Sequence, residues 1–449
     1  MPFSAKTFIE AKSIFCYYLT EEKCRERQKY SLRDIMELIE RNYYLDQLIR
    51  KRSNGLVKVI TGIRRCGKSY LLDPIYKNWL LSQGVSEEHI IKIELDRPQN
   101  IKYYHDVEAF DQYLRSFLKD DGMYYVLLDE IQLVDNFEYV LNGLLYDKNV
   151  DVYVTGSNSQ FLSSDIVSVF RGRGDPIAMS PLSFSEYYKA VNMDKQEAFS
   201  EYLRFGGMPF LVGIKQDKDK SAYLKSLFEL TYFRDIVERY SIKRMDILEA
   251  ITDLLASSIG SLTNPQKIYT TFKSKGEKEL SLNTINSYLR YLEDSFLVRK
   301  AMRYDVKGRK YISTPQKYYF TDLGLRNAKL NFRQQEESHL MENAIFNELI
   351  YRGYGVDVGV VETRKGDKRV QTEVDFVCNQ GNKRYYIQSV LNLGTHEKTV
   401  QESRPLNNIQ DNFRKFILVE DGQKPWVTED GILVLNVIDF LLNENSLDL

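Results

Sequence analysis

The sequence has few of the residues that build disulfide frameworks and zinc sites. Only four of its 449 residues are cysteines, and only four are histidines. The cysteines, Cys16, Cys24, Cys66 and Cys378, include no pair with C-x-x-C spacing. A structural zinc site or a disulfide framework is therefore not expected, and a reducing, cytoplasmic environment is.

Long apolar runs are also absent. No stretch reaches the roughly 18 apolar residues that a membrane-spanning helix needs. The brief apolar patch from Ile14 to Leu19 lacks the basic lead-in and the small-residue cleavage site of a signal peptide. With 24 glycines and 10 prolines, the chain is poor in residues that favour long disordered segments. We therefore expect folded domains and no membrane partner.

Neither sign of charge is in excess. The chain has 62 lysines and arginines against 63 aspartates and glutamates, which gives a net charge of −1. A near-neutral chain is not a general binder of polyanions, so any contact with nucleic acid must come from a local basic patch. At about 150 residues per domain, the length predicts roughly three domains.

The N-terminal residues 1–35 show little periodicity. Apolar side chains begin to keep helical spacing near Ile35 and continue to Ile49. One hypothesis is that Met36 is the true start and that residues 1–35 are a translated leader. The alternative is a genuine flexible extension. A tryptic peptide from upstream of Met36, found by mass spectrometry of the native protein, would exclude the leader.

The segment 57–180 alternates between strand and helix patterns. Short apolar strands are predicted at 57–61, 89–95, 124–130 and 150–157. Helices are predicted from residue 68 to about 81, at 106–119 and at 136–146. Alternation at these lengths is typical of a parallel sheet covered by helices, so we expect an α/β core.

A phosphate-binding motif lies between the first strand and the first helix of this core. The sequence GIRRCGKS fits G-x-x-x-x-G-K-[ST], with glycines that let backbone N–H groups wrap a phosphate. The positive end of the following helix points at the same anion. We expect Lys68 to neutralise phosphate charge and Ser69 to ligate Mg²⁺. The predicted nucleotide site comprises Gly62, Ile63, Arg64, Arg65, Cys66, Gly67, Lys68, Ser69 and Tyr70.

A hydrophobic strand that ends in two acids supplies the second part of a nucleotide site. In YYVLLDE, Asp129 is expected to hold Mg²⁺ and Glu130 to orient and deprotonate the attacking water. Adjacent acids favour an ATPase in which an added strand separates the two motif strands. No N-K-x-D motif that reads guanine is present, which disfavours GTP.

Two further segments contain candidate catalytic residues. After the strand at 150–157, Ser157 or Asn158 is placed to sense the terminal phosphate or the attacking water, with simple turn chemistry as the alternative. In FRGRGD, Arg171 and Arg173 are candidate fingers for a neighbour's nucleotide. The alternative for these arginines is a surface loop or a structural salt bridge.

Together these motifs resemble a known family. GIRRCGKS, LLDEIQ, VTGSNS, FRGRGD, PLSFSEYY and FGGMP are similar to motifs of a large family of bacterial and archaeal AAA-like ATP-binding proteins that have a C-terminal domain of unknown function. The resemblance covers most of residues 36–445 and implies ATP as the nucleotide, with no defined biological role. Family members typically begin near the helix that contains Tyr43 and Tyr44, which supports Met36 as the start.

The middle of the chain resembles a winged helix-turn-helix. Helices at 246–259 and 265–273 precede a third, which Ser281 caps, and strands at 297–304 and 310–320 follow. Residues 296–320 contain seven basic residues and one acidic residue, a local charge of +6. This pattern suits DNA, and the alternative is a winged helix that only packs domains or binds protein. The candidate DNA contacts are Asn283, Asn286, Arg290, Lys307 and Arg309.

The C-terminal segments HLMENAIFNELIYRGY, EVDFV and RYYIQSV resemble the restriction-endonuclease-like core. Glu342 and Asp375 match its metal ligands, but Gln388 and Val390 stand where a glutamate and a catalytic lysine belong. Glu373 can replace a ligand but not the cation. We therefore expect no cleavage activity, and the alternative for Glu342 and Asp375 is a structural role.

The sequence thus predicts a multidomain α/β ATPase that uses ATP and Mg²⁺ and whose cycle is coupled to DNA through the winged helix. The alternative is a nucleotide-dependent switch or scaffold for a protein partner, with slow turnover, and either form can be a homo-oligomer. The predicted parts are an N-terminal extension (1–35), an AAA-like P-loop core (36–180), a helical connector (181–245), a winged helix (246–330) and an inactive restriction-endonuclease-like domain (335–445).

Overall fold

A computed structural model describes residues 39–156, 170, 172–277, 279–334, 336–365, 368–420 and 424–448. The chain divides into two compact units, Met1–Glu40 and Arg41–Leu449. The hypothesis about Met36 falls outside the described residues. Among the described residues, no helix combines the length and the apolar character needed to cross a membrane. All the helices and strands that the structure describes lie in the second unit.

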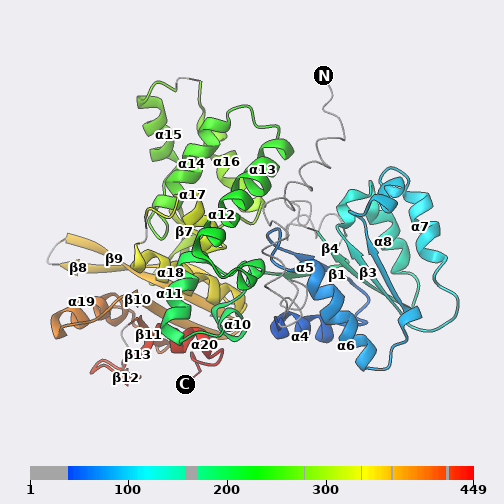
Figure 1. The fold of residues 1–449 in the computed structure, drawn as a ribbon. Helices are drawn as coiled ribbons and strands as arrows, with labels where there is room; N and C mark the ends of the chain where they lie inside the picture. The colour runs from blue at the N-terminus through cyan, green and yellow to red at the C-terminus, as the bar shows by residue number, and fades with distance from the viewer. Residues whose placement is uncertain are drawn as a thin grey trace. The chain divides into compact units, whose positions relative to one another are not determined.

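The first part of this unit contains a five-stranded parallel sheet (Figure 1). The strand order is β2-β3-β4-β1-β5. Strand β4 therefore separates β1, which leads into the phosphate-binding motif, from β3, which ends in the acids, as the sequence predicts. The strands are β1 (Val57–Thr61), β2 (Ile90–Glu94), β3 (Tyr124–Asp129), β4 (Val150–Thr155) and β5 (Gly174–Ala178).

Helices cover both faces of this sheet (Figure 1). One face packs against α7 and α8, because alternate strand residues such as Val59, Val126 and Val152 form one buried cluster with Phe110 and Leu141. The helical segments are α4 (Asn42–Lys51), α5 (Lys68–Tyr70), η1 (Leu71–Tyr76), α6 (Lys77–Ser82), η2 (Glu87–His89), η3 (Pro98–Tyr103), α7 (Val107–Arg115), η4 (Ile131–Leu133) and α8 (Phe137–Leu144).

The structure differs from the prediction at two places in this region. The helix expected from residue 68 to about 81 is interrupted at Asp73, whose backbone is extended, just before Pro74. Strand β5 was not predicted, because its sequence GDPIA has no alternating apolar pattern. It forms because it pairs along β1 as the outermost strand of the sheet. Proline has no N–H to donate to a neighbouring strand, and Pro176 is tolerated because β5 has a neighbour on one side only.

The second face of the sheet buries an ion pair. The Nζ of Lys58 contacts Asp151, and both side chains are almost completely buried. Asp151 also accepts hydrogen bonds from the Tyr153 hydroxyl (2.7 Å) and the Ser53 backbone N–H (2.9 Å). The pair therefore has the additional hydrogen bonds that offset the cost of burying two charges.

Removing one partner of this pair should strongly destabilise the fold. We expect Asp151→Ala to lower the free energy of unfolding by about 3–5 kcal/mol, because Lys58 would be left as an uncompensated buried charge. The control is Glu238→Ala, which breaks the exposed pair with Arg234 and should cost less than about 1 kcal/mol. Urea unfolding measures both, and equal losses in the two variants would contradict the expectation.

The middle of the chain is largely helical, as the sequence predicts. The three helices α14, α15 and α16 precede the hairpin β6–β7 in the expected order. Helix α17 was not predicted. The helical segments are α10 (Phe184–Ala190), α11 (Lys195–Phe205), η6 (Pro209–Gly213), α12 (Asp217–Leu227), η7 (Phe228–Phe233), α13 (Arg234–Arg239), α14 (Met245–Ser257), α15 (Pro265–Ser274), α16 (Leu282–Asp294) and α17 (Leu323–Lys329).

A mixed eight-stranded sheet forms the remainder, in the order β12-β13-β11-β10-β9-β8-β6-β7. The hairpin β6–β7 belongs to this sheet, because Arg303 to Asp305 of β6 pair in parallel with Val358 to Val360 of β8. The strands are β6 (Val298–Asp305), β7 (Lys310–Phe320), β8 (Gly355–Lys365), β9 (Lys368–Gln380), β10 (Lys383–Val390), β11 (Arg414–Val419), β12 (Trp426–Val427) and β13 (Leu433–Asn436).

Helices cover this second sheet as well. On one face α18 (Glu337–Tyr351) stacks Phe346 on Tyr319, with a ring-centroid distance of 4.1 Å. Leu406 of α19 (His396–Asn407) packs with Tyr386 and Ile417 in a separate buried cluster. The C-terminal helix is α20 (Val437–Leu442). The strands predicted as a wing and those predicted for the C-terminal domain therefore share one sheet.

Candidate functional site

The phosphate-binding motif forms the loop between β1 and α5, where the sequence places it. Two glycines make this loop possible. Gly62 has φ +138°, and a Cβ there would lie 2.0 Å from the Met179 carbonyl oxygen. Gly67 has φ +103°. A side chain would therefore be strained at both positions, and it would clash with backbone at Gly62.

Lys68 is a buried cation without an acidic partner. Its side chain is 5% exposed, and its Nζ donates to the carbonyl oxygens of Gly62 (3.0 Å) and Ile63 (3.1 Å). Among the residues that the structure describes, Lys68 forms no ion pair. A buried charge normally pairs with an opposite charge or a metal-bound group, so this ammonium group is available to an anionic ligand.

The acids at the end of β3 lie next to the loop. Asp129 accepts hydrogen bonds from the hydroxyl groups of Thr155 and Ser69, so the two predicted Mg²⁺ ligands are brought together. Burial raises the pKa of Asp129, the two hydrogen bonds oppose this, and the carboxylates of Glu130 and Asp96 add to the rise. A divalent cation at this position would relieve the repulsion among the three carboxylates.

Glu130 is held in an uncommon backbone conformation. Its φ of +55° lies in the left-handed region, and its backbone N–H donates to the Thr155 hydroxyl at 3.0 Å. Its side chain accepts a hydrogen bond from the Gln132 amide. A non-glycine residue kept in this region is common at functional sites, where surrounding structure fixes the conformation.

Sequence reasoning missed two residues of this site, Thr155 and Asp96. Thr155 ends β4 and contacts both acids, whereas the prediction chose the residues that follow it. The parallel sheet could have indicated Thr155. Strand β4 lies next to β3, so the last side chain of β4 lies beside the acids at the C-terminal end of β3. Asp96 follows β2, which pairs with the other side of β3.

One other predicted catalytic residue, Arg173, is not brought to the loop. Asn158, with Ser157 and Arg171, lies outside the described residues. Arg173 precedes β5, and β5 runs parallel to β1 with Gly174 opposite Val57. Arg173 therefore lies at the N-terminal ends of β1 and β5, whereas the phosphate-binding loop follows the C-terminal end of β1. The length of strand between the two ends is about 13 Å. Its guanidinium lies over the Tyr146 ring at 5.5 Å.

The two arginines of the loop contact the helices that follow the core. Arg64 forms an ion pair with Asp235 of α13, and its carbonyl oxygen accepts a hydrogen bond from the Tyr232 hydroxyl at 2.6 Å. Burial raises the pKa of the Tyr223 hydroxyl of α12, and the nearby positive charge of Arg65 opposes this rise. The conformation of the loop is thus tied to α12 and α13.

A buried arginine holds the other side of the loop. Arg41 donates to the carbonyl oxygens of Cys66 (3.2 Å) and Ser180 (2.6 Å), and its Nε lies 3.2 Å from a carboxylate oxygen of Glu186. Glu186 also forms a capping box with Ser183 at the start of α10. The segment PLSFSEYY therefore contributes to the support of the loop.

Comparison with known proteins bears on this architecture. Residues 54–188 match the family model of the AAA domain, and residues 196–336 match that of a domain of unknown function (DUF8612). An uncharacterized protein of Haemophilus influenzae is 34% identical over 412 residues, which cover 90% of this chain and 99% of the relative. This chain belongs to the same family. The AAA domain, residues 54–188, contains the phosphate-binding loop and both acids.

More distant relatives and structures were also found. An uncharacterized protein of Methanocaldococcus jannaschii is 26% identical over 410 residues, which cover 86% of this chain and 87% of that protein. The Aeropyrum pernix ORC1 protein, solved in complex with DNA, is 12% identical with a TM-score of 0.32, over 66% of this chain and 93% of that one. AMPPCP-bound DnaA from Aquifex aeolicus is 16% identical with a TM-score of 0.28, over 60% and 92%.

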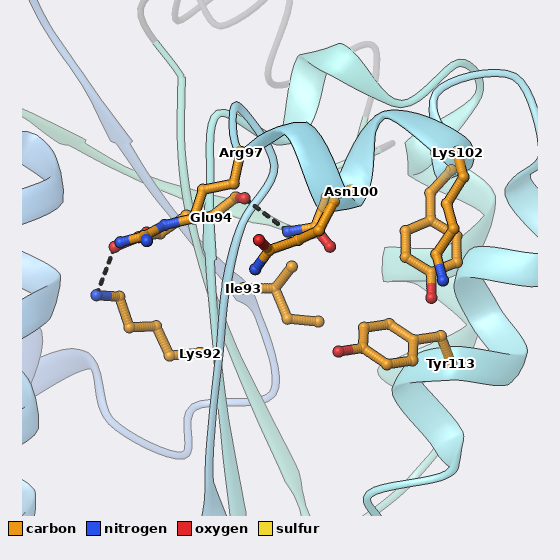
Figure 2. A pocket seen from close by; sticks show the side chains of 9 residues that line it. Lys92, Ile93, Glu94, Arg97, Asn100, Lys102 and Tyr113 are labelled. Atoms are coloured by element: carbon orange, nitrogen blue, oxygen red, sulfur yellow. Dashed lines mark hydrogen bonds and ion pairs between the residues drawn. The ribbon is translucent and has the colours of Figure 1, made fainter.

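A hollow of about 430 Å³ lies beside β2 of the AAA domain (Figure 2). One wall is fixed by Glu94, whose carboxylate pairs with Lys92 (2.6 Å) and Arg97 and whose carbonyl oxygen accepts from Asn100 (2.8 Å). The backbone N–H of Leu95, next to Asp96, donates to the Asp129 carbonyl oxygen at 3.1 Å and so holds this segment beside Asp129. The hollow is lined by Lys92, Ile93, Glu94, Arg97, Gln99, Asn100, Lys102, Tyr103, and Tyr113.

Asp322 connects the segment FGGMP to α17. Its carboxylate accepts hydrogen bonds from the backbone N–H groups of Gly207 (2.8 Å) and Leu325 (2.9 Å), and no cation pairs with it among the described residues. Burial raises its pKa to about 6, although these N–H groups oppose the rise. Pro209 of the same segment would lie 4.0 Å from a Cβ on Gly67, so FGGMP approaches the phosphate-binding loop.

The raised pKa of Asp322 predicts a pH dependence of stability. Between its ordinary pKa of 3.8 and about 6, the folded protein holds the proton more tightly than the unfolded chain. The contribution of Asp322 therefore falls as the pH rises through this window, by about 3 kcal/mol in total. Urea unfolding at pH 4.5, 5.5 and 7 measures this effect. As the pH rises, the free energy of unfolding should fall less for Asp322→Asn than for the wild type. If the free energy of unfolding had the same pH dependence in both proteins, the raised pKa of Asp322 would be contradicted.

The predicted nuclease-like residues meet around a buried lysine. Lys317 of β7 is 4% exposed, and its Nζ lies 2.9 Å from Glu342, 2.7 Å from Glu373 and 3.7 Å from Asp375. Burial lowers the pKa of Lys317, but the three carboxylates outweigh it and hold the pKa above its ordinary value. Glu342 and Asp375, the two residues that match metal ligands in the sequence, therefore belong to one cluster.

The expectation that this cluster has no cation is wrong. Val390, which stands where the lysine was expected, is buried and carries no charge. Strand β7 supplies a cation to the cluster from another part of the chain, namely Lys317. Gln388 stands beside Asp375 and accepts weakly from the Asp375 N–H, at 3.4 Å. Sequence reasoning missed Lys317 because β7 lies more than fifty residues before Asp375 in the chain and was assigned to a separate wing.

Several basic residues of the hairpin are bound to groups within the protein. Arg299 donates to the Ser180 hydroxyl (3.1 Å), Lys300 pairs with Glu293 (3.2 Å), and Lys307 donates to the Glu362 carbonyl oxygen (2.8 Å). Glu293 offsets the charge of Lys300, and three carboxylates surround Lys317, so less than the full local charge of +6 is left unpaired. Arg309 remains exposed at the turn, and the three candidate contacts on α16, Asn283, Asn286 and Arg290, are exposed.

Proposed function

We propose that the AAA domain binds ATP with Mg²⁺ and hydrolyses the ATP. The observation that carries this proposal is the hydrogen bond between Ser69 and Asp129, beside the buried ammonium group of Lys68. A strand-end carboxylate, a hydroxyl and a lysine in this arrangement are the groups that P-loop ATPases use to hold Mg²⁺ and phosphate. The residues present therefore fit both groups.

In this proposal each residue of the loop has a separate task. Backbone N–H groups from Ile63 to Tyr70 surround the phosphates, and Lys68 exchanges its carbonyl partners for phosphate oxygens. Ser69 and Asp129 hold Mg²⁺, which neutralises phosphate charge when bound. The two glycines allow the positive φ angles that the loop backbone needs for this shape.

Glu130 is the proposed general base for the attacking water. Thr155 fixes both acids, since its hydroxyl donates to Asp129 and accepts from the Glu130 backbone N–H. Thr155 is therefore a positioning residue. Asn158 remains the proposed sensor of the terminal phosphate. Arg171 or Arg173 remains the proposed arginine finger, which would contact the nucleotide of a neighbouring copy. Because Arg173 lies at the end of the strands opposite to the phosphate-binding loop, that role requires a neighbouring copy in a homo-oligomer.

The test is an assay of nucleotide binding and turnover on the full chain. We expect Mg²⁺-dependent ATP binding and phosphate release, with GTP as the weaker ligand. The same assay with added single-stranded and double-stranded DNA tests the coupling. Absence of ATP binding at millimolar concentration would contradict the proposal.

A second candidate is a nucleotide-dependent switch that acts on a protein partner. The ion pair of Arg64 with Asp235 favours it, because phosphate binding at the loop would compete with Asp235 for the Arg64 guanidinium and so weaken the link between the loop and α13. This role predicts slow turnover, a nucleotide that persists through purification and no effect of DNA. Fast hydrolysis that DNA stimulates would favour the first candidate.

Two finer proposals concern the remaining segments. We propose that residues 246–330 act as a winged helix that contacts DNA through the exposed side chains of α16, with Lys307 and Arg309 as hairpin contacts. We also propose that residues 335–445 are a restriction-endonuclease-like domain without cleavage activity, since Lys317 occupies the space between the carboxylates. DNA cleavage that Asp375→Ala abolishes would contradict the second proposal.

A further inference from the structure

A second hollow lies far along the chain from the AAA domain, in the eight-stranded sheet. It has a volume of about 280 Å³ and lies where the β6–β7 turn, the β9–β10 turn and the start of β11 meet. We name it the hairpin pocket. It is lined by Tyr304, Arg309, Asn379, Gly381, Asn382, Lys383, Arg384 and Phe413.

Aromatic rings surround the cation of this pocket. The guanidinium of Arg384 lies 5.5 Å from the Tyr304 ring and 5.4 Å from the Phe413 ring. Tyr311 packs edge-on against Tyr304 with centroids 5.4 Å apart. Phe413 is 40% exposed and Tyr311 is 62% exposed. Phe413 and Tyr311 thus expose part of their ring surface to solvent, and Arg384 lies against the Phe413 ring.

The pocket is also positively charged. Arg309, Lys383 and Arg384 line it, and no carboxylate does. Arg384 is fixed in place because its Nε donates to the Asn379 side chain at 2.7 Å. Of the nearby acids, Asp448 pairs with Lys383 at the exposed rim and Asp357 accepts from Tyr311.

Two hairpin cations are free to contact a ligand. Within the described part of the chain, the side chains of Arg309 and Lys310 form no ion pair or hydrogen bond, unlike the other basic residues of the hairpin. Both are exposed, and Arg309 belongs to the pocket. A ligand with one flat ring and flanking negative charges would use the aromatic faces and these cations together.

We propose that the hairpin pocket binds single-stranded nucleic acid, with one base on the aromatic faces and the adjacent phosphates at Arg309 and Lys310. Stacking of bases on aromatic rings within a positively charged groove is how proteins hold single strands. A duplex keeps its bases stacked on one another, so it cannot offer one to the pocket. This binding is separate from the ATP site and from the proposed duplex contacts of α16.

The first test replaces the exposed ring. Binding of a fluorescein-labelled 15-nucleotide oligo-dT to the full chain is followed by anisotropy, without ATP, so that a failure here leaves the ATPase proposal untouched. We expect Phe413→Ala to weaken binding about tenfold, since stacking is worth roughly 1–3 kcal/mol per base. The control is Tyr139→Ala, which removes a 67% exposed ring from the AAA domain and should change nothing.

The second test separates stacking from charge. The slope of log affinity against log salt concentration should become shallower by about 0.7 in Arg309→Ala, because one phosphate contact is lost. Phe413→Ala should keep the wild-type slope, and Lys148→Ala, which removes an exposed cation of the AAA domain, serves as the control. The proposal is overturned if oligo-dT does not bind, if a 15-base-pair duplex binds equally well, or if the pocket variants behave as their controls.

Discussion

Replacing Glu130 by glutamine should lower the rate of ATP hydrolysis by about 10²- to 10⁴-fold, the usual contribution of a general base. The amide keeps the shape of the side chain but cannot accept the proton from the attacking water. ATP affinity should stay nearly unchanged, because the proposed contacts with phosphate come from the loop and from Lys68. Single-turnover hydrolysis and nucleotide binding by fluorescence together measure the two effects.

The matched control for this variant is Glu108→Gln, an exposed glutamate at the start of α7 in the same domain. It should retain wild-type turnover. The backbone of Glu130 has φ +55°, which glutamine has to adopt as well, so the unfolding transition of both variants should be recorded. Unchanged turnover in a folded Glu130→Gln protein would refute the role of this residue as the base.

Replacing Lys68 by alanine should weaken ATP binding by at least about 30-fold. Removing one member of a buried, hydrogen-bonded charge pair typically costs 2–5 kcal/mol of binding energy. Among the described residues, Lys68 donates only to the carbonyl oxygens of Gly62 and Ile63. Its loss should therefore affect the ligand far more than the fold, which distinguishes it from the buried Lys58.

The control for this variant is Lys148→Ala, which should bind ATP as the wild type does. Lys68→Arg provides a second comparison, because arginine keeps the charge but not the compact ammonium geometry. Isothermal titration with a non-hydrolysable ATP analogue and Mg²⁺ gives the affinities. Wild-type affinity in Lys68→Ala would contradict the assignment of the whole loop as a phosphate site.

The parts that the sequence predicts well are those whose residues are neighbours in the chain. The strand that leads into Gly62 and the strand that ends in Asp129 each carry their own apolar pattern, and the two adjacent acids indicate an added strand between them. Strand β4 occupies that position. The identity and spacing of these residues are local, so a single sequence is enough to place them.

The parts that the sequence does not predict depend on contacts between distant segments. Strand β5 has no pattern of its own and exists because the edge of β1 is available. Thr155 becomes part of the site only because β4 lies beside β3. Lys317 was counted as surface charge, whereas it neutralises carboxylates that follow it in the chain.

Local charge is similarly hard to interpret from sequence. The basic residues of segment 296–320 suggest a surface for DNA, yet Arg299, Lys300 and Lys307 satisfy groups within the protein. Which cations remain for a ligand depends on where acids and carbonyl oxygens lie in space. Only the folded structure distinguishes Arg309 and Lys310 from the other basic residues of this segment.

The pairing of β6 with β8 limits how the chain can be divided into fragments for experiments. A fragment that ends near residue 330 would leave the β6 edge at Arg303 to Asp305 without its partner strand and open to pairing with another chain. A fragment that starts near residue 335 would lack Lys317 and leave Glu342, Glu373 and Asp375 to repel one another. Residues on both sides of this boundary therefore have to be expressed together.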